Sequence, residues 1–151
     1  MGASDQFLVC RIGERLCALP IAHVSETMRP LAVSPLPGTE PFVLGAAVVR
    51  GETVPVVDAR LLLGEPKRIR PGRLVSLRVG DRRAALAVDE VIGVRTLAPE
   101  QLETLPALLQ SASTDVVAAL RRLDQQLLFV LHAGKVVPPT AWEALEVSVR
   151  P

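Results

Sequence analysis

The sequence is poor in aromatic residues. Only 3% of its 151 residues are aromatic: three Phe, one Trp and no Tyr. Few rings are therefore available to stack on a base, a sugar or a flavin, which disfavours functions that need aromatic platforms. Hydrophobic residues still make up 49% of the chain. This content excludes a disordered chain and predicts a core that is aliphatic and largely β-branched.

An excess of one charge and a long hydrophobic run are also missing. Seventeen basic residues face sixteen acidic ones, for a net charge of +1, which disfavours nucleic-acid binding as the main function. The longest apolar run, residues 42–49, is far shorter than the roughly 20 residues that cross a membrane as a helix. The first residues show no signal-peptide pattern. We expect a cytoplasmic protein without direct membrane insertion.

Catalytic and metal-binding motifs are absent as well. The sequence has no G-x-S-x-G, P-loop or G-x-G-x-x-G pattern, and its two Cys and two His lack zinc-ligand spacing. Glu26 and Glu52 are single carboxylates without an obvious partner for acid–base chemistry. We therefore expect no enzyme, no cofactor and no metal. A small enzyme or ligand-binding barrel that uses Cys10, Cys17 or His132 is the competing interpretation.

Short apolar runs separated by turn signals predict β-hairpins. One covers residues 7–20 with a Gly-Glu turn and places Cys10 opposite Cys17, where two reduced core thiols are expected rather than a redox pair. Another covers residues 74–88 with a Gly-Asp turn. A third pairs residues 42–49 with 53–57, and Gly51 is expected to supply a positive φ in its turn.

Further local signals concern a proline and three helices. Because Pro55 cannot donate a ladder hydrogen bond, we expect its strand at a sheet edge. Asp58 is predicted to cap a short helix over residues 59–63. Short helices are also predicted over residues 102–109 and 141–145. Thr140 would cap the latter, which would place Trp142 against the β-structure.

The two halves of the chain resemble each other. The first hairpin overlays the second at a shift of 67 positions, and residues 49–63 overlay residues 123–137 at a shift of 74. Closely spaced short strands favour barrels or sandwiches. We predict a single all-β domain over residues 1–151, with subdomains at about 7–64 and 73–137. A polar linker would join them, and the segment 138–151 would pack on them.

A set of ordered motifs spans nearly the whole chain. It comprises Val43-Leu44-Gly45, Arg50-Gly51, Val54-Pro55-Val56-Val57-Asp58 and Arg60, flanked by Phe7-Leu8-Val9, Ala18-Leu19-Pro20-Ile21, Val24-x-Glu26, Leu36-Pro37 and Ala87-Val88-Asp89-x-Val91. In this order and spacing, over about residues 7–137, the sequence resembles the CheW family of bacterial chemotaxis coupling proteins.

The resemblance implies two small five-stranded SH3-like β-barrels and an adaptor function. Such an adaptor joins the CheW-like regulatory domain of the histidine kinase CheA to the cytoplasmic tips of chemoreceptors (methyl-accepting chemotaxis proteins) in membrane-associated arrays, and other CheW-like domains are further partners. By position, Val24, Glu26, Gly45 and Arg50 match places near the family's partner contacts. Packing is the alternative role for Val24 and Gly45, and bridging of the two halves is the alternative for Arg50.

Three departures from the family pattern stand out. Val48-Val49 replaces an Asn-Leu pair, the glycine expected near residues 118–119 is missing, and His132 replaces an Asp. Loss of that Asp removes an acceptor for the amides at the following helical start. These changes raise the alternative of a divergent coupler in a non-flagellar chemosensory pathway, such as one for pili or surface growth.

Overall fold

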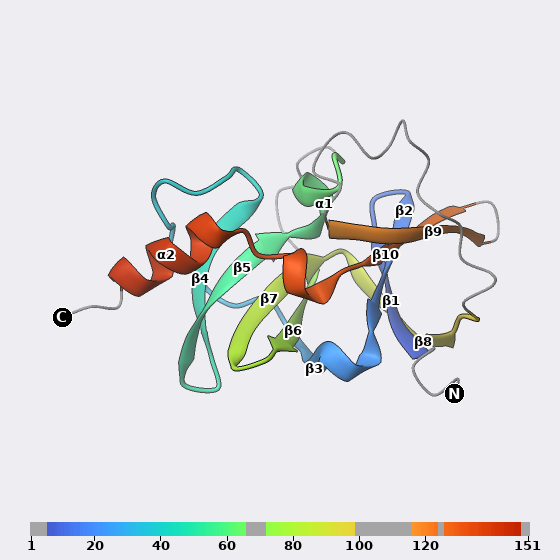
Figure 1. Ribbon diagram of the computed structural model, residues 1–151, viewed down its shortest axis with the longest axis horizontal. Coiled ribbons are helices and arrows are strands. Elements are labelled where there is room, and N and C mark those ends of the chain that lie inside the picture. Colours follow the sequence, from blue (N-terminus) through green and yellow to red (C-terminus); the bar gives the residue numbers. More distant parts are fainter. Residues whose placement is uncertain (1–5, 66–71, 99–115, 124–125, 149–151) are drawn as a thin grey trace.

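The computed structural model describes residues 6–65, 72–98, 116–123 and 126–148, which are mostly β-structure (Figure 1). The strands are β1 (Gln6–Ile12), β2 (Arg15–Pro20), β3 (Val24–Met28), β4 (Val43–Val49), β5 (Glu52–Asp58), β6 (Arg73–Val79), β7 (Arg82–Val88), β8 (Glu90–Thr96), β9 (Val117–Leu123) and β10 (Gln126–Leu131). The helical segments are η2 (Ile21–His23), α1 (Ala59–Leu62), η6 (Ala133–Lys135) and α2 (Pro139–Ser148). The predicted helix over residues 102–109 lies outside the described residues.

The strands form two five-stranded sheets, in the orders β8-β1-β2-β10-β9 and β3-β6-β7-β5-β4. Two five-stranded β-modules were predicted, and the mainly β fold is confirmed. The division of the chain is different, because each sheet takes strands from both the 7–64 and the 73–137 segments. β3 leaves the first hairpin to pair with β6, while β10 returns to pair in parallel with β2. One sheet is therefore a consecutive stretch of the chain, from β3 to β7, while the other combines β1 and β2 with β8, β9 and β10.

The internal repeat explains the two strand orders. At the predicted shifts, β1, β2 and β3 correspond to β6, β7 and β8, while β4 and β5 correspond to β9 and β10. With this correspondence the order β8-β1-β2-β10-β9 becomes β3-β6-β7-β5-β4, so equivalent strands occupy equivalent places. The repeat is therefore a structural duplication in which β3, β4 and β5 of the first copy have exchanged sheets with β8, β9 and β10 of the second.

Most of the local turn and cap predictions hold. Cys10 lies opposite Cys17 in the β1–β2 hairpin, and both are free, buried thiols. The Asp58 side chain accepts a hydrogen bond of 2.9 Å from the backbone amide of Arg60 at the start of α1. The prediction for Thr140 is wrong, because α2 begins at Pro139 and Thr140 lies inside it.

The edge position predicted for Pro55 is also wrong. β5 lies between β7 and β4. Its parallel pairing with β7, however, begins only at Val56, whereas Pro55 pairs with Ala46 of β4. At Pro55 the strand therefore has a neighbour on one side only, and this position tolerates the missing donor as an edge would.

In the described part of the chain, the buried residues form three largely aliphatic clusters. Each sheet has a small cluster of its own: Phe7, Val9, Leu16, Ala18, Leu97, Leu128 and Val130 in one, and Ala47, Val49, Val54, Val56, Leu74, Ala85 and Ala87 in the other. A larger cluster takes the alternate residues of strands from both sheets and includes Leu8, Cys10, Leu86 and Leu131. Strands buried on both faces account for the continuous apolar runs of the sequence. Trp142 of α2 packs against the shared cluster, as predicted.

Candidate functional site

Glu26 and Arg50 lie at opposite edges of one sheet. Glu26 belongs to β3 and Arg50 directly follows β4, and these are the two outermost strands of the order β3-β6-β7-β5-β4. Arg50 and Gly51 form the turn between β4 and β5, with φ angles of 53° and 79°. Two consecutive positive φ values match the type I′ turns that close two-residue hairpins. The glycine supplies a positive φ as predicted, but the arginine adopts one too, at a cost of about 1–2 kcal/mol.

The two side chains form a bidentate ion pair. The Arg50 Nε donates to Glu26 Oε2 at 2.8 Å, and Nη2 donates to Oε1 at 2.7 Å. The hydrogen bonds from Arg50 are the main reason why the pKa of Glu26 lies below its usual value, so the carboxylate is charged at neutral pH. The sequence offered no acid–base partner for Glu26, and the structure gives it a partner of another kind, the guanidinium of Arg50. This ion pair does not bridge the two halves of the repeat, since Glu26 and Arg50 both belong to the first half, residues 7–64.

The pair takes the place of backbone pairing between β3 and β4. Within the described residues these strands do not pair with each other, so the sheet is an open barrel whose edges are held by a side-chain contact. The Arg50 side chain is 70% exposed and that of Glu26 is 29% exposed. The site therefore presents a guanidinium at the surface. The Glu26 carboxylate fixes its orientation and so the direction in which its remaining N–H donors point.

Gly45 permits a close backbone approach. Its φ is 144°, and a Cβ at this position would clash with the carbonyl oxygen of Ser34. Ser34 and Ala46 exchange two backbone hydrogen bonds, of 2.8 and 2.7 Å. A glycine is thus required for the segment before β4 to pack on β4. The structure gives Gly45 the packing role considered in the sequence analysis and does not bring it to the ion pair.

Val24 precedes Glu26 on β3, where a register irregularity separates the two residues. Its side chain is half-buried against the shared apolar cluster. Of the four residues considered from the sequence, the structure therefore brings together Glu26 and Arg50, with Val24 on the same strand as Glu26.

A second polar cluster ties the two sheets together and was not predicted. The Asp89 carboxylate accepts hydrogen bonds of 2.7 Å from the Gly13 amide and from the Arg60 guanidinium. Arg15 donates to the Leu63 carbonyl at 2.9 Å and pairs with the Glu65 carboxylate at 2.9 Å. Asp89 and Arg60 both stood out as motif residues, but nothing in the sequence shows that they meet.

The residues of the competing enzyme interpretation do not form a reactive group. The pKa of the Cys17 thiol is raised, mainly by its hydrogen bond with Cys10 and secondly by its burial. The thiol is therefore a poor nucleophile. His132 is exposed and precedes η6, where it makes no side-chain capping hydrogen bond, as expected from the loss of Asp. In the described part of the chain, no three His, Cys, Asp or Glu residues are placed to hold a metal ion.

None of the described helices is both long and apolar enough to span a membrane.

Comparison with known proteins places this fold and site in context. Residues 6–139 match the family model described as CheW-like domain. The chain is 23% identical to the chemotaxis protein CheW of Helicobacter pylori over 134 residues, which covers 87% of this chain and 81% of that protein. It is 31% identical to protein PilI of Pseudomonas aeruginosa over 127 residues, which covers 82% and 71%. The scaffolding protein TtCheW from Thermoanaerobacter tengcongensis has the same fold, with a TM-score of 0.74, 24% identity, and coverage of 85% of this chain and 89% of that one.

Proposed function

The chain belongs to the CheW-like family, and on this premise we propose that it is an adaptor that couples chemoreceptors to a CheA-type histidine kinase and catalyses no reaction itself. Its partners are the CheW-like regulatory domain of the kinase, the cytoplasmic tips of the receptors and other CheW-like domains. These partners would recruit it to the cytoplasmic face of membrane-associated receptor arrays.

The Glu26–Arg50 pair is the observation that carries the proposal. Exposed ion pairs add little to stability, and an arginine at a φ of 53° costs stability. A strained turn that holds an exposed guanidinium in a fixed orientation is better explained by binding than by folding, because strained backbone is typical of binding sites. Both edges of the sheet contribute to this surface, so the binding of a partner would depend on how β3 and β4 are placed relative to each other.

Val24, Glu26, Gly45 and Arg50 receive different roles in this proposal. Arg50 would donate hydrogen bonds to a partner while Glu26 holds it in place. Val24 would provide an apolar contact beside them on β3. Gly45 would act indirectly, by allowing the segment around Ser34 to pack on β4.

Direct binding is the first test. The purified chain is titrated calorimetrically with the CheW-like regulatory domain of the kinase from the same organism, and separately with a receptor tip fragment. The proposal predicts saturable binding of both, and of both together in one complex. A chain that binds neither partner, alone or in the presence of the other, contradicts the coupling function.

A second candidate is the same adaptor function in a non-flagellar chemosensory pathway, such as one for pili or surface growth. It is supported by the higher identity to protein PilI, 31%, than to the chemotaxis protein CheW of Helicobacter pylori, 23%. Deletion of the gene distinguishes the two pathways. Loss of pilus-dependent or surface behaviour with normal swimming chemotaxis supports the non-flagellar pathway, and the opposite result supports swimming chemotaxis.

A further inference from the structure

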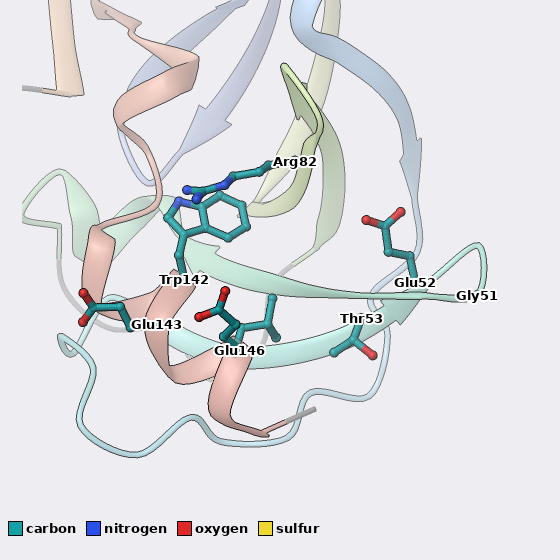
Figure 2. A pocket seen from close by; sticks show the side chains of 8 residues that line it. Gly51, Glu52, Thr53, Arg82, Trp142, Glu143 and Glu146 are labelled. Carbon is teal, nitrogen blue, oxygen red and sulfur yellow. The ribbon is translucent and has the colours of Figure 1, made fainter. Parts of the chain in front are cut away.

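Two neighbouring hollows lie on the surface of the β3-β6-β7-β5-β4 sheet and are here together called the α2 groove. The first, of about 550 Å³, lies over β4 and is largely apolar; it is lined by Leu31, Ala32, Ser34, Pro35, Leu36, Ala46, Ala47, Val48, Thr53 and Leu145. The second, of about 520 Å³, lies between α2 and the β4–β5 turn; it is lined by Gly51, Glu52, Thr53, Arg82, Trp142, Glu143, Leu145 and Glu146 (Figure 2). Thr53 and Leu145 line both, so the two hollows are neighbours.

The two ends of the α2 groove differ in chemistry. At the β4 end, Val48 is 62% exposed and Leu31 is 38% exposed, so two exposed aliphatic side chains line the same hollow. The α2 end carries three carboxylates, from Glu52, Glu143 and Glu146, and the guanidinium of Arg82. Glu52 pairs with Arg83 at 3.6 Å, so Glu143 and Glu146 supply the negative charge of this end. One end therefore favours aliphatic side chains, and the other favours a cation.

The chain itself shows that a guanidinium is accommodated at the acidic end. Arg82 lies over the ring of Trp142, with its Cζ 4.7 Å from the ring centroid, and Figure 2 shows this stack beside the α2 carboxylates. Within the described residues, Glu143 and Glu146 have no hydrogen bond or ion pair. Their spacing of three residues places them on the same side of α2. Two exposed carboxylates are thus available for a second cation.

From this charge complementarity we propose that the α2 groove binds an extended segment of a partner protein that carries two or more aliphatic side chains followed or preceded by a Lys or Arg. The aliphatic side chains cover Leu31 and Val48, and the cationic group lies between Glu143 and Glu146 beside Trp142. Neither Glu26 nor Arg50 lines this groove. The inference goes beyond the proposed coupling function and does not depend on it.

A peptide-display selection tests the proposal with the full chain. Random peptides of about twelve residues are selected on the wild-type chain and, in parallel, on the double variant Glu143→Gln/Glu146→Gln. Affinities of the selected peptides are then measured from the emission of Trp142, which is the single Trp of the sequence and lines the groove. Glu90→Gln serves as the matched control, since Glu90 is an exposed carboxylate on β8 in the other sheet.

Wild type should enrich peptides with aliphatic residues next to a Lys or Arg, and their binding should change Trp142 emission. Each exposed charge contact contributes roughly a threefold factor, so the double variant should bind about tenfold more weakly, and Glu90→Gln should bind like wild type. Val48→Asp should weaken binding through the apolar end. The proposal is wrong if no basic motif is enriched, or if the selected peptides bind the double variant as tightly as wild type.

Discussion

The substitution Gly45→Ala should unfold the edge of the β3-β6-β7-β5-β4 sheet. A φ of 144° is available almost exclusively to glycine and costs about 1–3 kcal/mol for another residue. The new methyl group would also displace the Ser34 carbonyl and break the two backbone hydrogen bonds between Ser34 and Ala46. Each bond contributes about 1 kcal/mol. The sum is a loss of about 4 kcal/mol, a large part of the stability of a small domain.

Urea unfolding, followed by the fluorescence of Trp142, measures this loss. With an m-value of about 2 kcal/mol/M, the midpoint should fall by about 2 M. Gly38→Ala is the matched control, because Gly38 has a φ of 79° but no atom within 4 Å of an added Cβ. It should cost only about 1 kcal/mol. Equal midpoints for the two variants would refute the role of the close approach at Gly45.

Three other perturbations have defined outcomes. Asp89→Ala removes the acceptor of two hydrogen bonds, including that from the partly buried Arg60, so the unfolding free energy should fall by about 2–3 kcal/mol; a loss below 1 kcal/mol would contradict this. The pKa of Glu26 lies below its usual 4.5 in the folded chain, so its stabilising contribution is present above that pH and is lost as the pH falls through the folded-state pKa. Stability measured from neutral to about pH 3 should therefore fall less steeply for Glu26→Gln than for wild type; equal slopes would refute the shift. His132→Asp restores a capping acceptor at η6, where the residue already has extended φ and ψ angles. It should raise the free energy of unfolding, measured by urea unfolding, by about 0.5–1 kcal/mol; no change would contradict a capping role for this position.

Features determined by neighbouring residues could be predicted from the sequence. The hairpin with Cys10 opposite Cys17 follows from two short apolar runs around a turn pair. The Asp58 cap follows from an acidic side chain directly before a helical run. The repeat was visible for the same reason, since both copies preserve these local signals.

The pairing of distant strands could not be predicted. β3 could pair with β1 or with β6. The choice depends on which arrangement buries more apolar surface, and β1 and β6 have similar patterns of apolar residues because they are equivalent strands of the repeat. The error over Pro55 has the same origin, because its single-sided environment depends on where the parallel β5–β7 ladder begins.

The arrangement of the candidate site could not be predicted from the sequence. Glu26 and Arg50 were identified through the resemblance to a family, while their ion pair was missed because it depends on the sheet bringing its first and last strands together. Opposite charges on the two outermost strands would have been the signal, had the strand order been known. The contact between Asp89 and Arg60 was missed because it depends on the pairing of β5 with β7, the strands that precede these residues.

Kinase coupling by Arg50 variants tests the central claim most directly. The measurement is receptor-controlled kinase activity in a reconstituted mixture of receptor, kinase and this chain, with Arg11→Ala as the control for loss of an exposed ion pair in the other sheet. Arg50→Ala should fold normally yet abolish most coupling, while Arg11→Ala should couple like wild type. The exchange Glu26→Arg/Arg50→Glu restores an ion pair between the two edges of the sheet, but position 50 no longer carries a guanidinium. We expect this variant not to couple the receptor to the kinase. Full coupling by Arg50→Ala, or by the exchanged pair, would contradict a direct contact between Arg50 and a partner.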